Sequence, residues 1–303
     1  PRFGITTTFV DPDEPQNFAA AVQDNTRMFF AESLGNPKLD VLDLKAIAQL
    51  AKNAKVPFVV DNTVATPALL NPIAHGANIV IHSLTKYISG NGTSIGGVII
   101  DAGTFDWGNG LFPEFTEPNP SYHGLVYHDV LGAIAFIAKA RIEGLRDLGS
   151  APSPFNSFQV IQGLETLTLR MKQHSENAQA LAEWLEGRDE VAWVNYPGLA
   201  SSKYNALANE YLPEGKSGIV TFGLKAGFEG GKKVADTTQL FSLLANIGDT
   251  KSLIIHPAST THQQLNVEEQ KSTGVTSDLI RLSVGIENVE DLIADLTQAF
   301  ESL

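Results

Sequence analysis

Short apolar runs alternate with helical patterns over the first third of the chain. The runs cover residues 5–10, 27–31, 57–61, 78–82 and 97–100. This alternation is typical of an α/β fold with a mostly parallel sheet. The clearest helix is predicted over residues 40–54, with Asp40 as its N-cap and Asp43 in its first turn.

Two of these runs end in side chains that can take part in catalysis. Asp61 closes the run 57–61, and Ser83 and Lys86 follow the run 78–82. Because the carboxyl ends of parallel strands line the ligand crevice of such folds, these three residues can face one cavity. An amine, a carboxylate and a hydroxyl are groups that pyridoxal phosphate needs for its Schiff base, its ring nitrogen and its phosphate. Taken singly, a strand-end aspartate is more often a cap, and a lysine is more often solvated.

Two domains are expected in a chain of 303 residues. Residues 103–127 are rich in proline, glycine and aromatic residues, which favours a packed loop without regular structure. A long helix is predicted over residues 155–185, and the domain boundary is placed inside it. We therefore expect a catalytic domain over residues 1–168 and a smaller α+β domain over residues 169–303. The last helix is expected to begin at an Asn288 cap, and strands are predicted over residues 191–196, 218–224, 253–256 and 279–284.

The composition argues against several classes of protein. A net charge of −13 disfavours nucleic acid or an anionic membrane as a partner. The chain has no cysteine, which excludes disulfides, thiolate metal sites and a cysteine nucleophile. The histidines show no paired-ligand spacing, so no metal site is expected. There is neither a membrane-span pattern nor a signal peptide pattern, so a soluble cytoplasmic protein is expected.

Several motifs resemble those of the Cys/Met-metabolism family of pyridoxal-phosphate enzymes, which have the fold type I, aminotransferase-like architecture. The motifs are ESLGNP at residues 32–37, VDNT at 60–63, SLTK at 83–86, HPASTTH at 256–262 and RLSVG at 281–285. The resemblance covers essentially the whole chain. It implies a mostly parallel, seven-stranded type of cofactor domain, incomplete in this sequence, and a smaller C-terminal α+β domain.

The resemblance also implies roles for individual residues around pyridoxal 5′-phosphate. Lys86 would be the Schiff-base lysine and proton shuttle, and Asp61 the partner of the ring nitrogen. Ser83 and Thr85 would bind the phosphate. Asn36 would lie near the ring hydroxyl and the substrate. Without the resemblance, Asn36 would be interpreted as a turn residue, and both hydroxyls as strand-end caps.

Arg281 and Asn246 complete the implied substrate site. By the resemblance, Arg281 would bind the α-carboxylate of the substrate, with Asn246 beside it where relatives often carry serine. A guanidinium fork suits a carboxylate better than an ammonium group does, which supports this role independently. The alternative is a solvent-facing arginine on a strand.

The activity implied is a γ-replacement, in which O-acetyl-L-homoserine and sulfide give L-homocysteine and acetate in methionine biosynthesis. Longer stretches at residues 112–124 and 153–158 favour this reaction over those of related enzymes. The alternatives are O-succinylhomoserine sulfhydrylation, cystathionine γ-synthesis and methionine γ-elimination, and methanethiol could replace sulfide. A homotetramer built from catalytic dimers is also implied.

An N-terminal segment is expected to be missing from the sequence. Pro1 is not an initiator residue, and residues 3–10 resemble the middle of an apolar strand. Relatives carry a phosphate-binding glycine turn, a tyrosine stacked on the cofactor ring and an N-terminal arm upstream of this point. The residues given are therefore expected to hold the cofactor poorly or not at all.

Two other enzyme classes have partial motifs in the chain. Residues 92–96 match the Gly-x-Ser-x-Gly elbow of serine hydrolases through Ser94, but an apolar strand pattern follows where a helix is required. Residues 215–217 match the end of a phosphate-binding P-loop, but Glu210 occupies the position of its first glycine. Both classes are therefore disfavoured.

Overall fold

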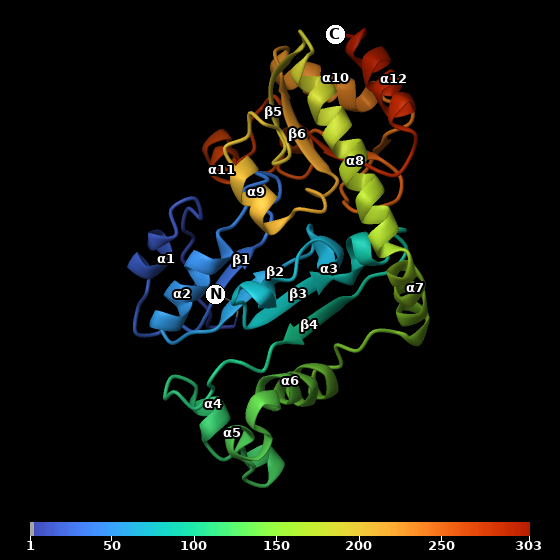
Figure 1. The fold of residues 1–303 in the computed structure, drawn as a ribbon. Coiled ribbons are helices and arrows are strands. Elements are labelled where there is room, and N and C mark those ends of the chain that lie inside the picture. The colour runs from blue at the N-terminus through green and yellow to red at the C-terminus, as the bar shows by residue number, and fades with distance from the viewer. Residues whose placement is uncertain (1–2) are drawn as a thin grey trace.

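Two β-sheets with helices packed on them organise residues 3–303, the part of the chain that the computed structural model describes (Figure 1). The first sheet has the order β1-β2-β3-β4, in which β1, β2 and β3 run parallel and β4 is antiparallel to β3. Its strands are β1 (Phe29–Glu32), β2 (Phe58–Asp61), β3 (Ile79–Ser83) and β4 (Gly97–Asp101). The α/β fold class and these four predicted strands are confirmed.

The predicted strand over residues 5–10 is wrong. This segment has no regular structure, and the first described helix is α1 (Gln16–Ala20). Ile5 is 60% exposed and Phe9 is 92% exposed. A strand needs a neighbour that pairs with its backbone and a face that is buried. Residues 5–10 pair with no strand in the described part of the chain.

The predicted helix over residues 40–54 is shorter than expected and has a different cap. Helix α2 (Leu44–Asn53) begins after Asp43, whose side chain accepts a hydrogen bond of 3.1 Å from the backbone N–H of Ala46. Asp40 instead lies in the loop that leads to the helix. The backbone N–H of Gly35 donates to the carbonyl of Asp40, so the chain at Asp40 folds back on the segment that follows β1. The helix cap therefore lies three residues later than predicted.

The second sheet has the order β5-β6-β9-β8-β7 and is mostly antiparallel. Its strands are β5 (Val191–Asn195), β6 (Ile219–Leu224), β7 (Ser242–Leu243), β8 (Leu253–Ile255) and β9 (Leu279–Ser283). Four of these strands were predicted, whereas β7 is too short to give a pattern. Three helices pack on this sheet: α8 (Leu167–Glu186), α10 (Gly227–Thr237) and α12 (Val289–Phe300) (Figure 1). Asn288 caps α12 as predicted.

The single helix predicted over residues 155–185 is two helices. Helix α7 (Pro154–Glu165) ends at Thr166, whose dihedral angles are not helical, and α8 follows it directly. The Thr166 hydroxyl donates a hydrogen bond of 3.3 Å to the carbonyl of Gly163. Threonine side chains compete in this way with helical hydrogen bonds. The predicted domain boundary inside this region remains a prediction.

The aromatic segment over residues 103–127 is packed, as predicted, but contains short helical turns. Trp107, Phe112 and Phe115 are buried, and the rings of Trp107 and Phe115 stack with centroids 4.4 Å apart. Helix α4 (Pro113–Thr116) and the 3₁₀ turn Pro120–Tyr122 both start at proline, which the first helical position tolerates. The other α-helices of the described residues are α3 (Thr66–Leu69), α5 (Tyr127–Leu131), α6 (Ala135–Lys139), α9 (Asn205–Tyr211) and α11 (Val267–Ser272).

Apolar packing joins the two sheets. One buried cluster combines Phe58 and Val60 of β2 with Tyr211 and Ile219 from the second half of the chain. Loops from both halves therefore hold fixed positions relative to each other. Among residues 3–303, no helix has the length and apolar character needed to cross a membrane.

Candidate active site

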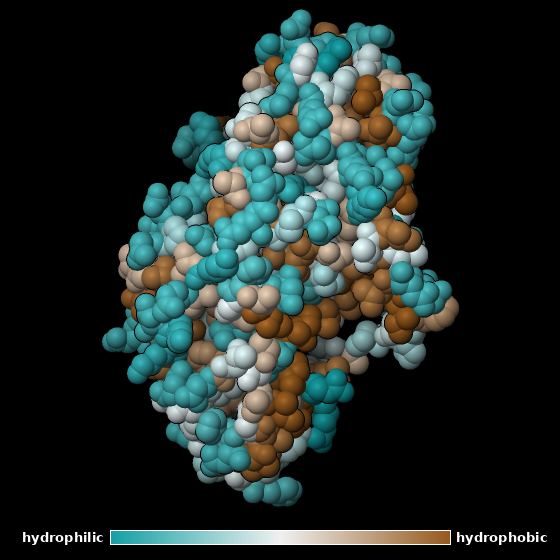
Figure 2. Space-filling model, in the orientation of Figure 1, coloured by the Kyte–Doolittle hydropathy of each residue, from teal (hydrophilic) through white to brown (hydrophobic). Residues whose placement is uncertain are grey.

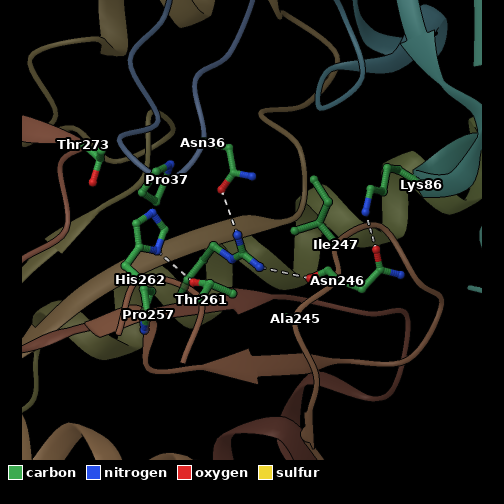
Figure 3. A pocket seen from close by; sticks show the side chains of 11 residues that line it. Asn36, Pro37, Lys86, Ala245, Asn246, Ile247, Pro257, Thr261, His262 and Thr273 are labelled. Atoms are coloured by element: carbon green, nitrogen blue, oxygen red, sulfur yellow. Dashed lines mark hydrogen bonds between the residues drawn. The ribbon is translucent and has the colours of Figure 1, made fainter. Parts of the chain in front are cut away.

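A cavity of about 300 Å³ lies where loops of the two sheets meet (Figure 3). Four of the predicted site residues line it, namely Asn36, Lys86, Asn246 and Arg281. The other lining residues are Pro37, Ala245, Ile247, Pro257, Thr261, His262 and Thr273. Residues far apart in the sequence thus form one site.

Lys86 enters this cavity from a π-helical turn, η2 (Leu84–Ile88), directly after β3. Its amine donates a hydrogen bond of 2.5 Å to Oδ1 of Asn246 (Figure 3). Partial burial lowers the pKa of the Lys86 amine, and the nearby positive charge of Arg281 lowers it further. A lowered pKa increases the uncharged fraction of the amine, and only the uncharged amine can act as a base.

Arg170 on α8 holds the turn that carries Lys86. Its guanidinium is buried and donates to the backbone carbonyls of Tyr87 (2.7 Å), Ile88 (3.3 Å) and Gly163 (2.6 Å). A reactive side chain is precise only when its supporting residues are locked. Nothing in the spacing of the sequence identified Arg170, because the two carbonyls of the Lys86 turn that it binds lie more than 80 positions away.

Arg281 projects from β9 into the cavity and has no carboxylate partner among the described residues. Its Nη1 donates to Oδ1 of Asn36 at 3.2 Å, and its Nη2 donates to the carbonyl of Asn246 at 3.2 Å. Its Nε is buried and has no hydrogen-bond partner among residues 3–303. Burial lowers the pKa of this guanidinium to about 10. Because a buried charge without a counter-ion is costly, the site favours an anion.

Asp61 and Ser83 lie at the carboxyl ends of neighbouring strands, as predicted. Asp61 ends β2, and its Oδ1 accepts a hydrogen bond of 2.9 Å from the backbone N–H of Thr63. Ser83 ends β3. Neither residue lines the 300 Å³ cavity. Their roles toward the cofactor remain predictions.

Thr85 also lies outside the cavity lining, and its hydroxyl is engaged. The hydroxyl donates to the carbonyl of Gly96 at 3.3 Å and accepts from the Gly96 N–H at 3.1 Å. These bonds tie η2 to the start of β4. Binding of a phosphate by this hydroxyl remains a prediction and requires at least one of these bonds to be exchanged.

Glu32 and His262 are site residues that sequence reasoning did not single out. Glu32 ends β1 and is the register partner of Asp61. Its position after an apolar run is the same signal that identified Asp61. His262 lines the cavity, where partial burial and the charge of Arg281 lower its pKa. It lies within a recognised motif, but the motif alone does not show which of its residues faces the cavity.

The geometry does not favour the two alternative motifs. Ser94 is buried and donates its hydroxyl hydrogen bond to Gln159, and β4, not a helix, follows it. The Lys216 amine donates to the carbonyl of Leu212 at 2.8 Å, and the Ser217 hydroxyl donates to the carbonyl of Val64 at 2.8 Å. These groups stabilise the local fold.

The Lys86 amine follows a parallel strand and shares one cavity with the Arg281 guanidinium. This arrangement suits pyridoxal phosphate acting on an amino acid, because the cofactor needs a lysine for its Schiff base and the substrate carries a carboxylate. The family model for Cys/Met metabolism PLP-dependent enzymes matches residues 1–301, and the chain belongs to this family. Its cofactor is therefore pyridoxal 5′-phosphate.

Curated relatives and a solved structure agree with this assignment. The chain is 56% identical over its whole length to an O-acetyl-L-homoserine sulfhydrylase of Leptospira meyeri, of which the match covers 71%. It is 50% identical to a homocysteine synthase of Schizosaccharomyces pombe, over 99% of this chain and 71% of the relative. A crystal structure of an O-acetylhomoserine (thiol)-lyase from Campylobacter jejuni superimposes with a TM-score of 0.92 at 44% identity. That match covers 96% of this chain and 70% of the other, which carries a pyridoxyl-lysine phosphate adduct.

Proposed function

We propose that this enzyme converts O-acetyl-L-homoserine and sulfide into L-homocysteine and acetate, a step of methionine biosynthesis. The observation that carries the proposal is the unpaired Arg281 guanidinium in the same cavity as the Lys86 amine. An α-amino acid offers a carboxylate for the first group and an amine that can replace the second at the cofactor. The names of the relatives support the choice of substrates.

The cofactor supplies a carbonyl that joins the substrate amine and a ring that disperses the negative charge formed when a proton leaves. The chain supplies the remaining functions. Arg281 binds and orients the substrate carboxylate through its guanidinium fork. Lys86 accepts a proton at Nζ and returns it later, so that the same amine serves as base and acid. Asn246 orients Nζ, because its Oδ1 accepts the hydrogen bond from Lys86.

We assign the other cofactor contacts to strand ends on the same edge of the first sheet. Asp61 would keep the ring nitrogen protonated, which strengthens the ring as an acceptor of electrons. Ser83 and Thr85 would contact the phosphate, and Asn36 the ring hydroxyl. The residues present fit the cofactor in chemical type. A carboxylate ends β2, and two hydroxyl groups and an amine come in that order at and just after the end of β3.

The test of the proposal compares substrates with the purified holoenzyme. O-acetyl- and O-succinyl-homoserine are each supplied with sulfide or methanethiol, and homocysteine, methionine and 2-oxobutanoate are quantified. The acetyl ester with sulfide should give the highest kcat/KM. A difference of one methylene between two substrates changes the ratio of their kcat/KM values by about 10- to 200-fold, and the assay resolves a ratio of this size. Release of 2-oxobutanoate without homocysteine would instead identify a γ-lyase.

A homotetramer built from catalytic dimers and a cytoplasmic location complete the proposal. Figure 2 shows apolar side chains at the surface in the lower half of the molecule. On α7 the exposed apolar residues are Phe155, Phe158, Ile161 and Leu164. Contiguous exposed apolar surface of this kind often marks a contact between subunits. Light scattering of the purified protein tests the assembly, and a monomer at micromolar concentration would contradict it.

A further inference from the structure

We propose that Glu32 is a positioning residue, which holds Asn36 against Arg281 and makes binding of a substrate carboxylate depend on the charge of Glu32. The inference rests on the proposed role of Arg281 as the carboxylate-binding residue. It adds a residue that acts through Asn36 without touching the substrate.

A continuous path of hydrogen bonds connects Glu32 to Arg281. Oε2 of Glu32 accepts a hydrogen bond of 3.0 Å from the backbone N–H of Asn36. Oδ1 of Asn36 accepts from Nη1 of Arg281 at 3.2 Å, and the dashed line in Figure 3 marks this second bond. Asn36 therefore has its backbone fixed by a carboxylate and its side chain fixed by the guanidinium. Movement of the Asn36 backbone would move the oxygen that orients Arg281.

The surroundings of Glu32 make its charge sensitive to pH near neutrality. The residue as a whole is exposed, but burial of its carboxyl group by the surrounding protein disfavours the charged form. The hydrogen bond from Asn36 favours the charged form, whereas the carboxylates of Asp61 on β2 and Asp40 in the following loop oppose it. The balance raises the pKa of Glu32 to about 7.

The direction of the effect follows from the strength of the hydrogen bond. Above its pKa, Glu32 is a carboxylate, and a hydrogen bond from an N–H to a carboxylate is stronger than one to a neutral acid. Below its pKa, Glu32 is protonated and holds the Asn36 backbone less tightly. The affinity of Arg281 for a carboxylate should therefore increase as the pH rises through the pKa of Glu32.

Butyrate is a suitable probe, because it offers a carboxylate but has no amine to react with the cofactor. Its dissociation constant is measured by calorimetry with the holoenzyme between about pH 6 and about pH 8, the range around the pKa of Glu32. The same series is run on Glu32→Gln, which keeps an oxygen acceptor but cannot ionise. Glu165→Gln on α7, outside the cavity lining, is the matched control.

We expect butyrate to bind about tenfold more tightly at the upper end of this range in the wild-type protein and in Glu165→Gln. His262 also lines the cavity, but its protonation would favour an anion at low pH, which is opposite in sign to the effect of Glu32. The increase in affinity with pH should therefore be lost in Glu32→Gln. In Glu32→Ala, the KM for O-acetylhomoserine should rise about tenfold at the upper end of this range, where wild-type Glu32 is charged, and less at the lower end, with a smaller change in kcat.

A pH dependence in Glu32→Gln equal to that of the wild-type protein would overturn the inference, as would an unchanged KM in Glu32→Ala. The underlying role of Arg281 is tested separately. If Arg281→Lys binds butyrate as tightly as the wild-type protein, the proposed carboxylate site itself is wrong.

Discussion

The Lys86 amine and Oδ1 of Asn246 form a hydrogen bond of 2.5 Å between residues 160 positions apart. The backbone carbonyl of the same asparagine accepts from Arg281 at 3.2 Å. Asn246 thus fixes the proton-transferring amine relative to the guanidinium. The loop that carries Asn246 approaches the Lys86 turn closely at Gly248. Gly248 has φ of 74°, and a Cβ atom added to it would lie 2.6 Å from the backbone nitrogen of Tyr87.

Asn246→Asp should shift the pH dependence of catalysis. A carboxylate beside the Lys86 amine favours its charged form and raises its pKa. Because the base must be uncharged, the acidic limb of kcat should move to higher pH by about one unit. Asn246→Ser, which adds no charge, is the control. An unshifted limb in Asn246→Asp, or the same shift in Asn246→Ser, would contradict this account.

Arg281→Lys should weaken substrate binding more than turnover. The substitution keeps the charge but loses the planar fork that holds a carboxylate with two parallel bonds. We expect KM for O-acetylhomoserine to rise by about 10- to 100-fold. Arg188→Lys, which alters an arginine paired with Glu190 near the surface, should leave KM unchanged. Equal effects of the two substitutions would exclude a specific role for Arg281.

Asp61→Asn should reduce kcat by at least about a hundredfold while the protein stays folded. The amide oxygen can still accept from Thr63 N–H, so the local turn survives, but the negative charge near the ring nitrogen is lost. Asp101→Asn is closely matched, because Asp101 also ends a strand and accepts from a backbone N–H two residues later at 2.9 Å. Wild-type turnover in folded Asp61→Asn would refute the assignment.

His174 should make folding stability fall in mild acid. It is fully buried, and its Nδ1 donates to the carbonyl of Val284 at 2.7 Å. Its Nε2 has no hydrogen-bond partner in the part of the chain that the structure describes. Burial lowers the pKa of His174 to about 4. Below about pH 6.5, this histidine is therefore protonated in the unfolded chain but stays neutral in the folded chain. Stability is therefore lost as the pH falls from that value.

Urea unfolding of the wild-type protein and of His174→Gln tests whether His174 lowers the folding stability as the pH falls. Between about pH 7 and about pH 5, the stability difference between the two proteins should narrow by about 2 kcal/mol, because only the wild-type protein loses the contribution of this histidine. A difference that stays constant over this range would show that His174 does not titrate as described.

The strand ends of the first sheet could be predicted because their signal is local. Asp61 and Ser83 each close an apolar run, and parallel strands bring such ends together. Pairing of Lys86 with Asn246, and of Arg281 with Asn36, depends on how the two sheets dock, which no short-range pattern encodes.

The incorrect sequence predictions arise where the local sequence allows more than one structure. Asp40 and Asp43 are both acceptable helix caps by composition, and only the path of the preceding loop selects Asp43. The apolar run at residues 5–10 has strand composition, but composition cannot supply a partner strand. Arg170 was missed because a buried arginine that binds backbone carbonyls has no distinctive spacing.

Borohydride reduction of the holoenzyme, followed by peptide mapping, tests the central claim most directly. Reduction fixes the cofactor to the lysine that carries it, and Lys86 is the lysine that lines the cavity. We predict pyridoxyl modification on the peptide that contains Lys86, and neither modification nor turnover in a folded Lys86→Ala protein. Modification of any other lysine in the wild-type protein would contradict the site and the mechanism built on it.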